Sequence, residues 1–96
     1  MTVRDAINKS IDREFIEDAV GVIIVNNVTQ IMYRAFSIKE YISNKYSDIG
    51  YDDIIEGIIE GLSDDEDYED ILDWEYVDYA YSDEKVIFIY VNREDY

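Results

Sequence analysis

The feature that most constrains this chain is a long stretch with many acidic residues and no basic ones. Between Lys45 and Lys85 the sequence has sixteen Asp or Glu residues and neither Lys nor Arg. Residues 1–39 hold five acids and five bases, so residues 40–96 account for the entire net charge of −16. Concentrating one sign of charge costs self-repulsion, and a small domain stays dispersed with a net charge of only about 2 to 8. Solubility alone does not require this stretch, which we call the acidic block (residues 46–84).

Acid-rich segments are often disordered tails, because they bury too little apolar surface to fold. The acidic block differs from such tails, since apolar side chains recur through it. They are Ile54, Ile55, Ile58, Ile59, Leu62, Ile71, Leu72, Trp74 and Val77. We therefore expect the block to be folded, with these side chains buried.

The order of apolar patterns predicts one α+β domain that spans residues 1–96. Thr2 and Asp5 are spaced to cap a first helix, and apolar residues four apart follow them. Runs rich in β-branched and aromatic residues, each divided by a turn, are typical of hairpins. The expected order is α-ββ-α-α-α-ββ, with two hairpins forming one antiparallel sheet beside three to four helices. The expected elements are a helix over 2–19, a hairpin over 20–36, helices over 37–46, 52–62 and 63–73, and a hairpin over 74–92.

Two helices of the acidic block are expected to be amphipathic. At about 100° per residue, the isoleucines and leucine of 52–62 share one face and its acids share another. Gly57 and Gly61 lie between these faces and allow another backbone to approach closely. A capping box at residues 63–66 predicts that the next helix begins there, with its acids on the face opposite Ile71 and Leu72.

The sequence contains neither His nor Cys, so the commonest general base and the most reactive nucleophile are missing. A calcium-binding EF-hand loop counted from Asp64 fails, because its sixth position is Glu69 where that loop needs glycine. We therefore expect no enzyme, no cofactor and no dedicated metal site. The apolar runs fall well short of the roughly 20 residues that span a bilayer, and the N-terminus does not read as a signal peptide. We expect a cytoplasmic monomer or homodimer without a membrane anchor.

Four acids of the block have a spacing that suits a groove built for nucleic acid. Asp52, Glu56, Glu60 and Asp64 stand four residues apart, which on a helix separates them by about 6 Å. Phosphates along one nucleic-acid strand are about 6 to 7 Å apart. Like charges at this spacing weaken a helix by about 0.2 to 0.5 kcal/mol each. Their retention points to a function, although an ordinary solvated helix face is the alternative.

Further acids and three tyrosines complete a predicted partner-binding surface. Tyrosine offers a large contact area at little entropic cost, and arginine stacks on its ring. The predicted surface comprises Asp52, Asp53, Glu56, Glu60, Asp64, Asp65, Glu66, Asp67, Glu69, Asp70, Asp73, Glu75, Asp78, Tyr68, Tyr76 and Tyr79.

The row Asp52, Glu56, Glu60 and Asp64 and the cluster 64–70 resemble the phage-encoded DNA-mimic inhibitors, which include antirestriction and anti-CRISPR proteins. The resemblance is one of type, rests on charge pattern, size and tyrosine content, and covers about residues 46–84 without a diagnostic family motif. It implies a viral inhibitor that occupies the basic nucleic-acid-binding groove of a host defence nuclease, with a CRISPR effector ahead of a restriction enzyme. Direct binding of nucleic acid is disfavoured, because the phosphates would be repelled.

Two other classes stay open. An immunity protein or antitoxin would neutralise a basic nuclease toxin with similar electrostatics. A structural or regulatory phage protein would be acidic only incidentally.

Overall fold

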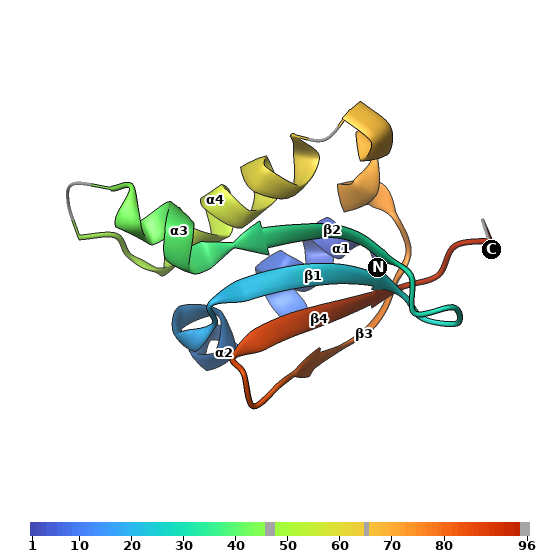
Figure 1. The fold of residues 1–96 in the computed structure, drawn as a ribbon, viewed down its shortest axis with the longest axis horizontal. Helices are drawn as coiled ribbons and strands as arrows, with labels where there is room; N and C mark the ends of the chain where they lie inside the picture. The colour runs from blue at the N-terminus through green and yellow to red at the C-terminus, as the bar shows by residue number, and fades with distance from the viewer. Residues whose placement is uncertain (46–47, 65, 95–96) are drawn as a thin grey trace.

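The computed structural model describes residues 1–45, 48–64 and 66–94, and combines helices with a four-stranded sheet (Figure 1). None of the helices in these ranges is long and apolar enough to cross a membrane. In chain order the elements are α1 (Val3–Asp5), η1 (Ala6–Ser10), α2 (Arg13–Asp18), β1 (Gly21–Asn26), β2 (Met32–Ser37), α3 (Ile38–Ser43), α4 (Tyr51–Ser63), η2 (Glu66–Tyr68), η3 (Ile71–Asp73), β3 (Tyr76–Tyr81) and β4 (Val86–Val91). η1 is a π-helix, and η2 and η3 are 3₁₀ helices.

The sheet has the order β2-β1-β4-β3. The predicted α+β class is confirmed, and so are the two hairpins, since β1 pairs antiparallel with β2 and β3 with β4. The expectation of a wholly antiparallel sheet is corrected, because β1 and β4 run parallel, with Val22 opposite Ile87 and Ile24 opposite Ile89. Parallel neighbours need a long crossover rather than a tight turn. The helices between the two hairpins supply that crossover.

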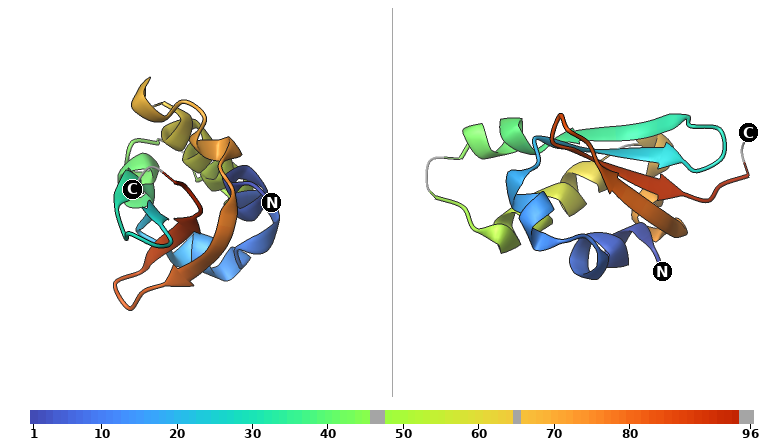
Figure 2. Two further views of the ribbon diagram at one scale, coloured as in Figure 1. Left: turned by 90° about the vertical axis from the view of Figure 1, so that its right-hand side faces the viewer. Right: turned by 90° about the horizontal axis from the view of Figure 1, so that it is seen from below.

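The helices α1, α2 and α4 lie on one face of the sheet (Figure 2). Alternate residues of the two central strands point into this layer, and Val22, Ile24, Ile87 and Ile89 are all at most 1% exposed. The helices contribute isoleucines and leucines such as Ile58 to the same core. The residues between these buried positions point the other way and form the outer face of the sheet, where Met32 is 67% exposed.

The N-terminal segment is not the continuous helix predicted for residues 2–19. The predicted cap at its start is present: the backbone N–H of Asp5 donates to the side chain of Thr2, and that of Thr2 donates to Asp5, each at 3.2 Å. The chain then turns extended at Ile11, and the side chain of Asp12 caps a new helix by accepting from the N–H of Glu14 (3.0 Å). Short polar side chains favour such local bonds over a continuing helix. The break brings Ile16 into the core.

The predicted helix at 38–46 begins as expected, because Ser37 accepts from the N–H of Glu40 (3.1 Å), but it ends at Ser43. Tyr46 lies outside the described residues.

The helix predicted for 52–62 is α4, and its two faces separate as the sequence indicates. Ile54, Ile55, Ile58 and Leu62 are buried. Gly57 and Gly61 do permit a close approach, but the groups that approach are aromatic rings rather than a backbone. A Cβ on Gly57 would lie 2.5 Å from Tyr41 Cζ, and one on Gly61 would collide with the ring of Phe36.

The helix predicted for 63–73 is wrong. Ser63 belongs to α4, where its hydroxyl donates to the carbonyl of Glu60 (3.1 Å) and so does not cap a new helix. The chain continues through the short helices η2 and η3 instead. Repulsion between acids three and four residues apart, with no base among them, disfavours a regular helix here. The predicted division of side chains still holds, since Ile71 and Leu72 are buried and Glu69 and Asp70 are exposed.

We expect Gly61→Ala to destabilise the fold by about 1 kcal/mol. Displacing the ring of Phe36 costs roughly 1 to 3 kcal/mol, and the higher helix propensity of alanine recovers about 1 kcal/mol. Urea unfolding midpoints at constant slope measure the difference. Gly50→Ala is the matched control: no atom lies within 4 Å of the added Cβ, so it lacks the steric cost and should lose only the roughly 0.5 kcal/mol that alanine costs relative to glycine at the N-cap of α4. A Gly61→Ala variant more stable than its parent would contradict the packing.

Candidate functional site

The outer face of α4 carries a row of carboxylates, which we call the acidic ridge (Asp52, Glu56, Glu60 and Asp64). All four residues are exposed. α4 holds the first three at steps of about 6 Å, and Asp64 follows as its C-cap residue. Each step of four residues also turns by about 40°, so the ridge winds gently around the helix in a right-handed sense. The ridge cannot slide or rotate, because the opposite face of α4 is packed into the core.

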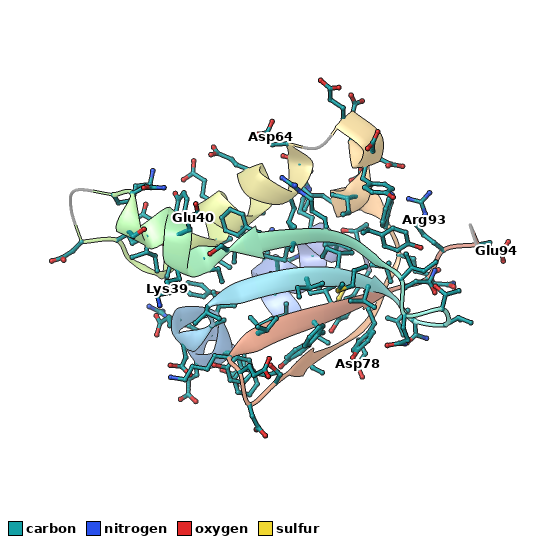
Figure 3. The ribbon with its side chains drawn as sticks, in the orientation of Figure 1. Lys39, Glu40, Asp64, Asp78, Arg93 and Glu94 are labelled. Atoms are coloured by element: carbon teal, nitrogen blue, oxygen red, sulfur yellow. The ribbon has the colours of Figure 1, made fainter. Side chains whose placement is uncertain are left out.

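The residues after α4 extend the ridge at one end. Asp64, Glu66 and Glu69 line one small hollow of about 150 Å³ together with Ser63. Asp67, Asp70 and Asp73 are also exposed, on η2, η3 and the turn between them. Figure 3 shows several side chains with oxygen tips around the orange segment that follows Asp64. The structure therefore brings the ridge and the acids of 66–73 together, and Asp65 lies outside the described residues.

Three predicted acids have other surroundings. Asp53 is exposed but caps α4, since its carboxylate accepts from the N–H of Gly50 (3.1 Å). Glu75 accepts from the side chain of Asn92 (2.9 Å). Asp78 pairs with Tyr90 on the outer face of the sheet, and Figure 3 shows it far from Asp64. Glu75 and Asp78 therefore do not widen the ridge as the sequence suggested.

The predicted tyrosines of β3 face the core. The register of β3 shifts at Val77, so Tyr76 and Tyr79 stand opposite the buried Val91 and Ile89. Burial raises the pKa of Tyr76, with a smaller contribution from Asp78. The ring of Tyr79 packs edge-on against Phe15, 6.2 Å between centroids. These two tyrosines support the sheet rather than the acidic ridge.

An aromatic hollow borders the ridge. Glu60 and Asp64 share an open hollow of about 490 Å³ with Phe36 and Tyr41, next to Gly61 and Gly57. The rings of Phe36 and Tyr41 lie 5.9 Å apart. The absence of side chains on the two glycines creates the room for these rings. The two glycines are evident in the sequence, but nothing in it indicates that Phe36 and Tyr41 contact them.

Basic side chains approach the ridge at the end near Asp52, from the side of the sheet, and at the aromatic hollow, where Nζ of Lys45 lies 4.7 Å from the ring centre of Tyr41. The guanidinium of Arg13 lies 4.7 Å from the ring centre of Tyr51 and pairs with Glu17 at 2.9 Å. The bond to Glu17 raises the pKa of Arg13, and the charge of Asp52 adds a smaller contribution. Arg34 reaches α4 from beneath, where Nη2 donates to the carbonyl of Gly61 (2.9 Å). Arg13 therefore offsets part of the negative charge near Asp52, and Arg34 part of that near Gly61.

A cluster of three aromatic rings lies beside η2, and we call it the aromatic cage (Tyr33, Tyr68 and Trp74). Each pair of rings is nearly perpendicular, at 75° to 82°, with centroids 5.0 to 5.5 Å apart. The guanidinium of Arg93 lies 3.8 Å from the centre of Trp74, 5.5 Å from Tyr33 and 6.0 Å from Tyr68. Of these residues sequence analysis named only Tyr68 as a site residue. No periodic signal links positions so far apart in the chain.

A separate charged contact joins α2 to the second hairpin, away from the ridge. The hydroxyl of Tyr81 donates to Asp18 (2.7 Å), and Lys85 lies 3.4 Å from the same carboxylate. The bond from Tyr81, followed by that from Lys85, lowers the pKa of Asp18. Burial and the bond to Asp18 raise the pKa of Tyr81 to about 12. The carboxylate of Asp18 thus stabilises the fold above about pH 4, and this contribution is lost as pH falls through the lowered pKa of Asp18.

The raised pKa of Tyr81 predicts how stability changes in alkali. Between about pH 10 and 12 the folded chain keeps a proton that an unfolded tyrosine has released, so stability falls as pH rises through this window. We expect Tyr81→Phe to lose less stability than its parent between pH 9 and pH 11.5, measured as the change in urea midpoint. The other tyrosines titrate in both proteins and cancel in the comparison. Equal losses in the two proteins would show that Tyr81 does not hold its proton in this way.

Comparison of the chain with protein-family models, curated proteins and solved structures finds no match. The described residues contain no group of three or more acidic side chains placed to hold a metal ion.

Proposed function

We propose that this protein is a non-enzymatic acidic inhibitor that binds the basic nucleic-acid-binding groove of a host defence nuclease and blocks access of nucleic acid. The observation that carries the proposal is the acidic ridge on α4, together with the exposed acids of 66–73 that continue it. The other face of α4 is buried in the core, and the segment 66–73 is anchored there by Ile71 and Leu72, with Tyr68 partly buried against it. The surface is therefore ordered before any partner arrives.

Charge supports a cationic partner. The net charge of −16 is concentrated in the acidic block. A field of one sign attracts an oppositely charged groove and speeds association, within a screening length of about 8 Å at physiological salt. An acidic ridge would thus be drawn to a groove that normally attracts phosphates.

The spacing of the ridge supports a groove that binds a phosphate backbone. Steps of about 6 Å along α4 are close to the separation of successive phosphates on one strand, about 6 to 7 Å. The ridge also winds in a right-handed sense, as a strand of duplex DNA does. A set of Lys or Arg side chains arranged for consecutive phosphates would meet consecutive carboxylates here.

The hollow formed by Phe36 and Tyr41 favours arginine among the basic groups of the partner. A guanidinium can stack on an aromatic ring while it donates hydrogen bonds to a neighbouring carboxylate. Glu60 and Asp64 stand beside these rings. Grooves that recognise nucleic-acid backbones are rich in arginine and lysine. We place a CRISPR effector first and a restriction enzyme second as the target, with the phage-encoded DNA-mimic inhibitors as the class that this protein resembles.

Charge reversal on the ridge and on the acids that continue it tests the proposal. Glu56→Lys/Glu60→Lys/Asp70→Lys should weaken inhibition of DNA binding by about 100-fold or more, because each reversal turns a charge attraction into a repulsion. The readout is binding of a labelled DNA target by purified CRISPR effectors and restriction enzymes, with increasing amounts of the protein. Inhibition by the parent should also weaken as NaCl rises from about 50 to 300 mM.

The matched control is Glu14→Lys/Asp83→Lys/Glu84→Lys, which makes the same change in net charge at exposed acids outside the ridge. Three reversals of two charges each bring both variants from −16 to −10. The control should inhibit nearly as well as the parent. Equal loss in both variants would show that only total charge matters, and unchanged inhibition by the ridge variant would disprove the proposal. Inhibition of a basic nuclease toxin alone would favour the immunity-protein class.

A further inference from the structure

The aromatic cage has the geometry of a binding site for a flat cation. The indole of Trp74 forms a floor 3.8 Å from the guanidinium carbon of Arg93, a stacking distance. Tyr33 and Tyr68 stand nearly perpendicular to this floor and to each other, and so form two walls. The faces of aromatic rings carry negative potential, and several rings around one cation are a known means of cation recognition. The cage is a preformed site that the chain fills with its own side chain.

The backbone of Arg93 is held in place by a contact outside the cage. Arg93 follows the last strand, and its backbone carbonyl accepts from Nδ2 of Asn26 (3.1 Å). Asn26 is fully buried, and it also donates to the hydroxyl of Tyr33 (2.9 Å) and accepts from the N–H groups of Val28 and Thr29. The backbone is therefore fixed at this carbonyl independently of the cage. The half-buried side chain of Arg93 thus reaches the rings from a backbone that is held in place without them.

The surroundings of the cage favour a cation from a partner. Tyr68 belongs to η2, the same short helix as the exposed acids Glu66 and Asp67, and Glu69 and Asp70 follow directly. The cage therefore shares η2 with acids that continue the ridge. An arginine of the partner would make the same stacking contacts with the three rings as Arg93 does, so exchanging one guanidinium for the other conserves these contacts.

We propose that the aromatic cage is an arginine-binding site, which Arg93 occupies in the free protein and an arginine side chain of the partner occupies in the complex. The proposal rests on the proposed function for the origin of that arginine, but the site itself is testable without a partner. Guanidinium is preferred to ammonium because a planar cation stacks on Trp74 and a compact, strongly hydrated one does not.

Trp74 is the sole tryptophan of the chain, so its fluorescence reports directly on the cage. The test titrates methylguanidinium chloride into Arg93→Ala and into the parent protein, with methylammonium chloride at equal concentration as the matched cation. We expect a saturable fluorescence change in Arg93→Ala at millimolar methylguanidinium. In the parent the same change should need at least about tenfold more, because Arg93 is tethered at a millimolar or higher effective concentration. Methylammonium should have a markedly smaller effect.

A second variant separates the cage from a general effect of guanidinium salts. Arg93→Ala/Tyr68→Leu keeps Trp74 as the reporter but removes one wall, and should bind methylguanidinium at least about threefold more weakly. No saturable change in Arg93→Ala, or equal responses to the two cations, would overturn the proposal. Arg93→Gln tests the same point with a neutral side chain of similar length. If circular dichroism shows that both Arg93 variants are unfolded, the guanidinium is a fixed part of the structure and the proposal also fails. A negative result would leave the ridge experiment unaffected, because no partner takes part.

Discussion

The parallel pairing of β1 and β4 is the constraint on which the rest of the structure depends. It joins two hairpins through their inner strands and places β2 and β3 at opposite edges of the sheet. The chain must therefore cross from one edge to the other between residues 38 and 75. This crossover carries most of the acidic block, and it packs its apolar side chains on one face of the sheet. Its acids consequently have no place except the outside of the crossover, where α4 arranges four of them in a row.

The fold accommodates its charge by placing apolar and acidic side chains on opposite sides of the same elements. α4 buries isoleucines and a leucine on one side and exposes Glu56 and Glu60 on the other. Exposed charges repel one another weakly because water and salt screen them, whereas a buried unpaired charge would cost several kcal/mol. A continuous core of branched apolar side chains can therefore offset the repulsion of a one-signed surface. That repulsion is a standing cost to stability, and a cationic partner would relieve it on binding.

Sequence periodicity was sufficient for α4 and insufficient for the segment after it. The 3.6-residue pattern of α4 agrees with its burial, and its glycines mark a true close approach. The segment 63–73 has the same kind of pattern, but its successive acids oppose a regular helix and it folds as two short 3₁₀ turns. The orientation of Tyr76 and Tyr79 depended on a register shift at Val77 that strict alternation does not predict. The aromatic cage depends on contacts between distant parts of the chain, which are set by the sheet topology and leave no local signal.

The central claim is that cationic groups are bound by one folded surface, the acidic ridge with residues 66–73, rather than by the negative charge of the chain as a whole. Titration of the ¹⁵N-labelled protein with a nona-arginine peptide at about 150 mM NaCl, followed through backbone amide chemical shifts, tests this claim most directly. The largest shifts are predicted at residues 56–73, with small ones around Glu14 and Glu84. Shifts of similar size at all exposed acids, including Asp78 on the outer face of the sheet, would contradict it.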